Sequence, residues 1–321
     1  MAHGRSSLLP SRPVVTLAGG VGAAKFIRGL VRVIAPRRLV AVVNTADDEE
    51  FYGLHVSPDL DTVTYTLAGV ANRVHGWGRD GDTFNVLGAL ARLYGSPWFM
   101  LGDRDLATHL YRSDRLRAGA TLSEVTAEIA SRFGLAARVL PMSDDAVRTF
   151  VKLRRRRAMP FQEYLVRNRA RGDVERIELR GIKRARPLPE VLRAIRSARA
   201  VILAPSNPFV SLGPILGLKG VRDALRSVRM RVAAISPIVG GRTIKGPADR
   251  MLRGLGLEVS AVGVARLYSD VAGTFVIDRA DRKRTSEIEQ LGMHAVAADT
   301  IMSSAARAEG LARVVLNSLP E

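Results

Sequence analysis

The residues best suited to chemistry are carboxylates gathered in one stretch of a strongly basic chain. The 321-residue sequence has a formal net charge of +18, yet no Lys or Arg lies between Arg38 and Arg73, where six Asp and Glu occur. Carboxylate oxygens suit a hard divalent cation, which usually keeps waters for substrate phosphates. We predict that four of them form a metal site, namely Asp47, Asp48, Asp59 and Asp61. A solvated acidic loop is the alternative, and it is our interpretation of Glu49 and Glu50.

A second charged cluster follows Gly102. Asp103, Arg104 and Asp105 are consecutive, and His109 lies four residues after Asp105 on the same helical face. Arg104 can fork two hydrogen bonds to a carboxylate or a phosphate. The pattern predicts a functional site at a cleft mouth, whereas an internal ion network is the alternative.

A glycine-rich turn near the N-terminus offers a place for phosphate. The apolar run Val14–Ala18 predicts a strand, residues 19–25 contain three glycines, and an amphipathic helix follows through Val33. This arrangement presents backbone N–H groups and a helix N-terminus to an anion. Lys25 stands where the dinucleotide motif needs its third Gly, and the second strand ends in Asn44 instead of an acid. A merely tight strand-to-helix connection therefore remains open.

The elements that must position these residues follow an α/β rhythm. Leu39–Val43 is a continuous apolar run of the kind buried in a parallel sheet, and Val201–Ala204 and Val232–Ile235 end in turns rich in Ser and Pro. Ligands of open α/β sheets bind beyond the carboxyl ends of such strands. We also predict a strand at Val259–Val264 and a strand-like segment at Trp98–Leu101.

The middle of the chain is expected to hold helices and a hairpin. A helix over Val63–Val74, with Asp61 or Thr62 as its N-cap, would follow the acidic window. Thr149–Lys152 and Phe161–Val166 are predicted to pair as a hairpin joined through Arg154–Arg157. These expectations give a Rossmann-like three-layer αβα core with a mainly parallel sheet and a mixed helical and hairpin insertion. The core takes residues 14–60 and 190–319, the insertion 61–189, and an N-terminal extension 1–13.

Composition narrows the class of protein. The chain has no cysteine, which excludes disulfides and thiolate sites. Neither an apolar run long enough to span a membrane nor a signal-like h-region is evident, so we expect a cytoplasmic enzyme.

The positive charge is concentrated between Lys152 and Arg199. This block contains 16 Lys and Arg and five Asp and Glu, so it holds +11 of the net charge of +18. A solvated basic face that attracts anionic substrates is our interpretation, with nucleic-acid binding as the alternative.

The order of these motifs resembles the 2-phospholactate transferase family of coenzyme F-420 biosynthesis (CofD, or FbiA in actinobacteria). The similarity spans residues 14 to 317. The motifs that match are the glycine turn at 19–22 and the segments 44–48, 57–62, 76–78, 82–84, 101–109, 140–145, 161–164, 205–208 and 236–241. This sequence departs from the family in Ala23-Ala24 after the glycine turn and in the run Arg154–Arg157.

The resemblance implies transfer of a phospholactyl, phosphoenolpyruvyl or related group from a guanosine diphosphate-linked donor. The acceptor would be the ribityl hydroxyl of the deazaflavin Fo, GMP would leave, and Mg²⁺ would be the cofactor. The implied catalytic residues are Asp61 and Arg104, and Trp77 and His109 join them as contacts to Fo. Candidate contacts to the nucleotide are Gly19, Gly20, Gly22, Asn44, Ser206, Asn207, Lys245 and Gly246.

Two other functions fit parts of the sequence. A nicotinamide-dependent dehydrogenase shares the opening strand, glycine turn and helix, and a non-catalytic nucleotide-binding regulator could be built on the same fold. Apart from small-molecule substrates, we expect a homodimer, no nucleic acid and no membrane partner. The intact sets Asp59-Leu60-Asp61 and Gly102–Asp105 favour an active enzyme.

Overall fold

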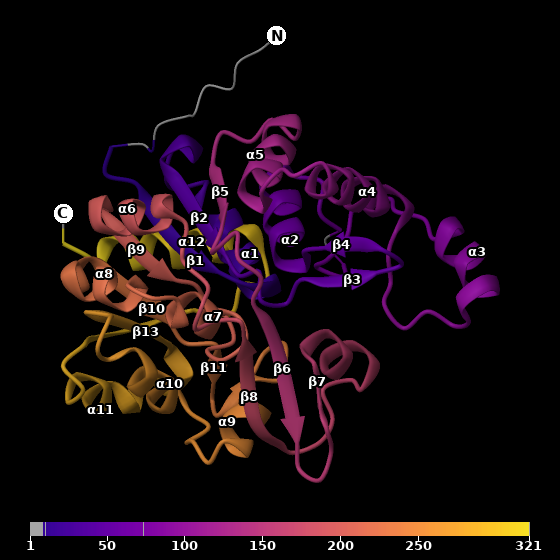
Figure 1. The fold of residues 1–321 in the computed structure, drawn as a ribbon. Helices are drawn as coiled ribbons and strands as arrows, with labels where there is room; N and C mark the ends of the chain where they lie inside the picture. The colour runs from indigo at the N-terminus through magenta and orange to yellow at the C-terminus, as the bar shows by residue number, and fades with distance from the viewer. Residues whose placement is uncertain (1–8, 10, 73, 321) are drawn as a thin grey trace.

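The computed structural model describes residues 9, 11–72 and 74–320. Figure 1 shows a central sheet with helices on both faces and a smaller sheet extending from its lower side. The strands of the main sheet are β1 (Val14–Ala18), β2 (Leu39–Val43), β5 (Arg138–Pro141), β9 (Ala200–Leu203), β10 (Val232–Ile235), β13 (Thr274–Asp278) and β14 (His294–Ala298). Their order is β14-β13-β10-β9-β1-β2-β5, and all their pairings are parallel. The predicted α/β class with a parallel sheet is confirmed.

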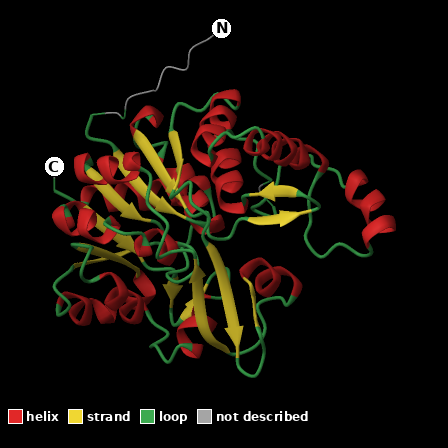
Figure 2. Cartoon of the chain, in the orientation of Figure 1, coloured by secondary structure: helices red, strands yellow, loops and turns green. Residues whose placement is uncertain are grey.

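Helices alternate with these strands and cover the sheet, as the red ribbons of Figure 2 make plain. They are α1 (Gly20–Leu30), α2 (Pro58–Leu67), α3 (Asn85–Tyr94), α4 (Asp103–Arg117), α5 (Leu122–Arg132), α6 (Pro189–Ser197), α7 (Leu212–Gly217), α8 (Val221–Ser227), α9 (Ala248–Gly254), α10 (Ala261–Tyr268), α11 (Thr285–Glu289) and α12 (Ala305–Asn317). Short 3₁₀ turns lie at Pro36–Arg38, Arg229–Arg231 and Arg279–Arg284, and a π-helical turn, η2, at Glu163–Arg167.

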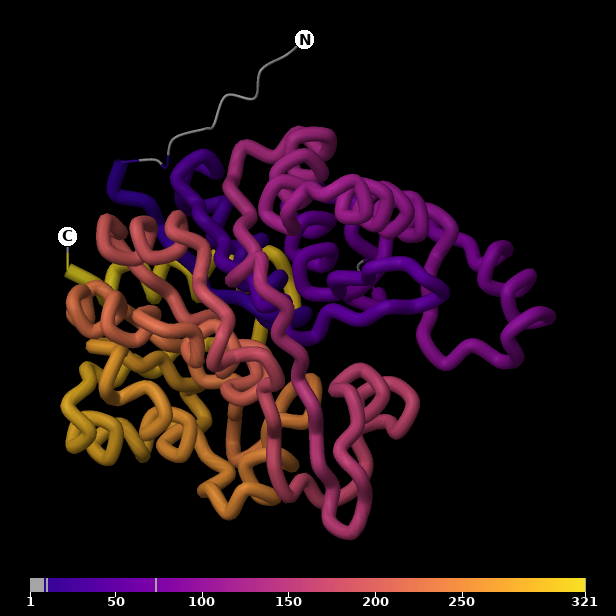
Figure 3. Tube along the Cα trace, in the orientation of Figure 1, coloured from indigo at the N-terminus to yellow at the C-terminus, as the bar shows by residue number. Residues whose placement is uncertain are grey.

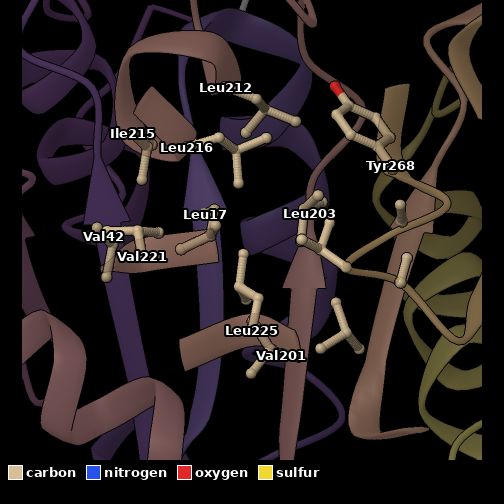
Figure 4. Packing of buried hydrophobic residues seen from close by; sticks show 14 of the residues in the cluster. Leu17, Val42, Val201, Leu203, Leu212, Ile215, Leu216, Val221, Leu225 and Tyr268 are labelled. Atoms are coloured by element: carbon tan, nitrogen blue, oxygen red, sulfur yellow. The ribbon is translucent and has the colours of Figure 1, made fainter. Parts of the chain in front are cut away.

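Most of these strands are apolar along nearly their whole length because both faces of the sheet are buried, whereas β14 at the sheet edge is partly exposed. Alternate residues point to opposite faces, so Leu17 and Val42 meet α6, α7, α8 and α10, whereas Ala18 and Val43 meet α1, α2 and α12. Figure 4 shows Leu212, Ile215 and other side chains from the first of these helix layers packed over the strands. Two separate cores, one on each face, give the three-layer arrangement expected of a doubly wound sheet.

The first and last helices lie against each other behind the sheet. A Cβ added at Gly29 of α1 would fall 2.3 Å from the backbone of Ala308 in α12. Only glycine permits so close an approach of two helix backbones, so α12 fixes the position of α1.

A second sheet extends away from the core. Its order is β7-β6-β8, formed by β6 (Arg148–Leu153), β7 (Ala158–Pro160) and β8 (Val174–Arg180), all antiparallel. The tube in Figure 3 shows this sheet reaching down from the core. Thr149–Lys152 do form a strand, but Phe161–Val166 lie largely in η2 and not in the predicted partner strand, because β7 and β8 take both edges of β6.

The insertion differs from the predicted range in one respect. β5 lies within residues 61–189 yet pairs with β2 in the main sheet. The segment is therefore interrupted by a strand of the core, and the proposed division into domains stays a prediction. Residues 1–8 and 10 of the proposed N-terminal extension lie outside the described residues.

Three local predictions are wrong. α2 begins at Pro58 with Ser57 as its N-cap, and Pro is favoured at the first helical position, so the helix starts before Asp61. Val259–Val264 leads into α10, where the Ser260 hydroxyl caps the helix by accepting from the Gly263 N–H at 3.0 Å. Trp98–Leu101 forms no strand. Its Phe99 instead stacks on Phe51 of the hairpin β3 (Glu49–Phe51) and β4 (Leu54–Val56), with ring centroids 4.1 Å apart.

No helix in the part of the chain that the structure describes is long and apolar enough to cross a membrane.

Candidate active site

A cavity of about 680 Å³ opens where the main-sheet strands end. Residues from the turn after β1, the start of α2, the turn after β9 and the segment after β14 line it together. Residues 243–248 and η2 close it from the side of the smaller sheet. It is the position at which doubly wound sheets bind ligands, because successive turns converge there.

The glycine turn forms one wall and begins α1. Gly20 has φ +71, a left-handed conformation that favours glycine. A Cβ at Gly22 would lie 2.4 Å from the carbonyl oxygen of Pro205, so the turns after β1 and β9 touch. The Ser206 hydroxyl donates to the Gly19 carbonyl at 2.9 Å and joins the same two turns. The helix N-terminus therefore reaches the cavity on a backbone that is held in place.

Two buried carboxylates share one amide beside this turn. Asn44 Nδ2 donates to Asp47 Oδ2 at 3.1 Å and to Asp59 Oδ2 at 3.0 Å, and the Gly20 N–H donates to Asp59 Oδ1 at 2.7 Å. Burial raises the pKa of Asp59 to about 6. Burial and the nearby Asp59 also hold the pKa of Asp47 well above its usual range. Because a bound cation would favour the ionised form of both acids, these two residues could hold one.

Asp48 lies behind this pair and does not line the cavity. Its Oδ2 accepts from the Ser57 hydroxyl at 2.8 Å and lies 2.9 Å from His55 Nε2. One oxygen of Asp48 and one of Asp47 are buried with no hydrogen-bond partner among the described residues. Of the four acids predicted to bind metal, Asp47, Asp59 and Asp61 face the cavity.

Asp61 is bound to a residue that the sequence prediction missed. Arg112 of α4 donates from Nη1 to Asp61 Oδ2 at 3.1 Å and from Nη2 to Asp61 Oδ1. The two side chains are only 2% and 7% exposed. Its spacing from Asp105 and His109, on one face of α4, is a signal that could have indicated it. Arg112, not Arg104, is therefore the partner of Asp61.

His109 connects two carboxylates at the cavity wall. Its Nδ1 lies 3.6 Å from Asp61 and its Nε2 lies 3.4 Å from Asp105, while the Tyr65 hydroxyl donates to Asp105 at 2.7 Å. Burial opposes the ionisation of Asp105, but the contacts from His109 and Tyr65 outweigh it and lower its pKa. Ligand atoms of Asp61, Asp105 and His109 all lie within 4.8 Å of one another, so they could also surround a cation. Arg112 already supplies a positive charge there.

Arg104 and Trp77 occupy different surroundings. Arg104 is exposed, its Nη1 donates to the Asp80 carbonyl at 2.8 Å, and it does not line the cavity. Trp77 lines the cavity with a 39% exposed ring that lies 5.5 Å from that of His75. The structure thus brings Trp77 and His109 to the cavity with Asp61 but leaves Arg104 outside it.

The other predicted nucleotide contacts also converge here. Ser206, Asn207, Lys245 and Gly246 line the cavity, and Asn44 lies just beneath it. Lys245 donates to the His75 carbonyl at 2.9 Å, and burial with the nearby Lys25 lowers its pKa. Lys25, also at the cavity wall, was not among the predicted site residues, although its place in the glycine turn could have indicated it.

An apolar wall completes the cavity. Its side chains are Val56, Phe99, Met100, Phe161, Leu165, Val166, Ile301 and Met302. The cavity therefore combines ionic groups suited to bind a phosphate with apolar side chains suited to a planar group.

Comparisons with known proteins found a matching family model, similar sequences and a similar fold. A family model described as 2-phospho-L-lactate transferase CofD matches residues 14–318. The 2-phospho-L-lactate transferase of Methanosarcina mazei is 38% identical over 305 residues, covering 95% of this chain and 100% of that protein. The phosphoenolpyruvate transferase of Kitasatospora aureofaciens is 41% identical over 309 residues, covering 94% and 96%. A Bacillus halodurans protein of the UPF0052 family has the same fold, with a TM-score of 0.63, 16% identity, and coverage of 96% and 100%.

Proposed function

Because the chain belongs to the 2-phospho-L-lactate transferase family CofD and is a transferase, we propose that it acts in coenzyme F-420 biosynthesis. It moves a phospholactyl, phosphoenolpyruvyl or related group from a guanosine diphosphate-linked donor to the terminal ribityl hydroxyl of the deazaflavin Fo. GMP is the leaving group. Relatives named for the phospholactate and for the phosphoenolpyruvate reaction match about equally well, so both donors are candidates.

The observation that carries the proposal is that one cavity combines groups suited to a diphosphate with an apolar lining. The glycine turn, Lys25 and Lys245 supply N–H groups and positive charge for a diphosphate. Phe161, Leu165 and the other side chains of the apolar wall suit a deazaflavin ring. An alcohol held by the apolar lining would meet the diphosphate beside Asp61, which also lines the cavity.

The buried acids fit a divalent cation such as Mg²⁺. Asp47 and Asp59 share a single amide donor, one Asp47 oxygen has no partner among the described residues, and burial raises the pKa of both acids. We assign these two as the main ligands, with Asp48 behind them. Asp61 takes a lesser part because both its oxygens are bound by Arg112. When bound, the cation would neutralise negative charge on the diphosphate.

The reaction is a direct displacement at phosphorus. The acceptor hydroxyl oxygen forms a bond to the phosphorus that carries the three-carbon group, and the bridging bond to GMP breaks. The two lysines stabilise the charge that collects on the transferred phosphoryl group and on GMP. The chain has no cysteine to form a thiophosphate intermediate. The proton of the hydroxyl passes to Asp61, whose position is fixed by Arg112 and which lies beside His109.

The test is incubation of the purified chain with Fo, Mg²⁺ and either the phospholactyl or the phosphoenolpyruvyl donor. A phosphodiester of Fo and an equal amount of GMP should appear, as followed by chromatography and mass spectrometry. Asp61→Asn should abolish transfer and leave binding of guanosine nucleotide nearly intact, whereas Asp114→Asn, at an exposed position of α4, should leave both unchanged. Absence of product with both donors from a folded protein would reject the proposal.

A further inference from the structure

A second cavity lies at the far end of the smaller sheet and is lined largely by arginine. It measures about 680 Å³ and shares no lining residue with the active-site cavity. The turn between β6 and β7 and the segment between η2 and β8 form its walls. We call it the arginine cavity, after Arg154, Arg155, Arg156, Arg167, Arg169 and Arg171.

Most of these arginines lack an acidic partner, unlike their neighbours. On the strands of the same sheet, Lys152 pairs with Glu175 at 3.3 Å, and Glu178 takes both Arg176 and Arg180. At the cavity, Arg167 pairs with Glu163. The other five arginines form no ion pair with any described residue, and Asp173 is the one carboxylate in the lining. The positive charge of the basic block is thus neutralised along the strands and left free around the cavity.

The segment that carries three of the arginines is held in a specific conformation. Arg169 and Ala170 have φ near +50, and Arg155 on the opposite wall has φ 60. Residues with a side chain adopt this region rarely and at some cost. The Ala170 carbonyl accepts from the Tyr164 hydroxyl at 3.1 Å and from Arg250 Nη1 at 2.6 Å. These hydrogen bonds fix the conformation of the turn that carries Arg169 and Arg171 at the cavity.

The lining defines the chemistry of the ligand. Guanidinium groups fork hydrogen bonds to phosphate oxygens, and several of them converging on one hollow favour a ligand with several phosphates. No aromatic ring is among the described residues that line the cavity, so it lacks the stacking platforms that single-stranded nucleic acids use. Its volume is that of a small-ligand site. We propose that the arginine cavity binds a compact anion carrying several linked phosphate groups, at a site separate from the active site.

The probe is inorganic tripolyphosphate, titrated into the full-length protein by calorimetry at about 150 mM salt, where non-specific charge attraction is screened. The test variant is R156Q/R169Q/R171Q, which removes charge from both walls. The matched control is R37Q/R196Q/R307Q, which removes the same charge from exposed arginines elsewhere. We expect a loss of affinity of at least 10-fold in the test variant and of less than about 3-fold in the control.

Equal losses in the two variants would overturn the proposal, because binding would then depend on net charge alone. No measurable binding by the wild type at this salt concentration would also overturn it. A single-stranded RNA that binds the same arginines more tightly than tripolyphosphate would replace the proposed ligand with a nucleic acid. Circular dichroism and transferase activity of the test variant should match those of the wild type, which shows that the loss of binding is not a loss of fold.

Discussion

We expect loss of the buried ion pair between Asp61 and Arg112 to lower the stability of the protein strongly. Arg112→Met keeps an unbranched side chain on α4 but leaves the Asp61 carboxylate buried without its guanidinium partner, with His109 Nδ1 3.6 Å away. Removing one partner of a buried ion pair strands the other charge, which costs roughly 3–5 kcal/mol. Replacing both partners, as in D61N/R112M, removes the stranded charge and should recover much of that loss.

The assay is equilibrium unfolding in urea at pH 7.5, followed by circular dichroism. With a slope of about 3 kcal/mol per M, a loss of roughly 3–5 kcal/mol lowers the midpoint by roughly 1–1.7 M. We expect the double-mutant cycle to give a coupling of about 2 kcal/mol or more.

Arg115→Met is the matched control, because Arg115 also lies on α4 and forks two 3.0 Å bonds to one acid, Glu128. Those two side chains are 37% and 34% exposed, so this pair should contribute at most about 1 kcal/mol. If R112M and R115M destabilise the protein equally, burial is not what makes the Asp61 contact strong, and the reasoning fails.

Three further predictions concern the site and its supports. The pKa of Asp59 is about 6 in the folded protein against 3.8 for the free side chain, so the folded state binds the proton more tightly than the unfolded state does. The contribution of Asp59 to the free energy of unfolding is therefore greatest below pH 4, and it falls by about 3 kcal/mol as the pH rises through 6. Relative to the wild type, Asp59→Asn should therefore gain stability between pH 4 and 7 in metal-free urea titrations. A difference in the free energy of unfolding that does not change with pH would contradict this. Gly22→Ala should destabilise by about 1–3 kcal/mol because its Cβ would meet the Pro205 carbonyl. Gly88→Ala, in open space on α3, should instead stabilise by roughly 0.5–1 kcal/mol, both read from thermal unfolding. Thr121→Ala should cost about 1 kcal/mol by the same measurement, because Thr121 and Glu124 form a capping box on α5.

The order of the main elements was predictable because parallel strands buried on both faces are continuous apolar runs. Leu39–Val43 and Val14–Ala18 were predicted to the residue. The final strand, β14, was missed since its His294-Ala295-Val296-Ala297-Ala298 is weakly apolar and partly exposed at the sheet edge. Strand signals are strongest where burial on both faces is complete.

The sequence allowed us to predict which segments form the site, but not which side chains contact each other within it. Asp47, Asp59 and Asp61 do face one cavity, as the acid-rich window suggested. The partner of Asp61 lies 51 residues along the chain, so no local pattern pairs the two residues. Only the packing of α4 against α2 selects which arginine is buried.

The close approach of Gly29 to Ala308 has a consequence for how the enzyme is made. The ribosome synthesises α12 after α1 and after all the strands of the main sheet, so α1 and the glycine turn at its start have no support from this helix until those strands have been made. A chain shortened before α12 should thus leave the glycine turn without this support, and with it the wall of the cavity that the turn forms.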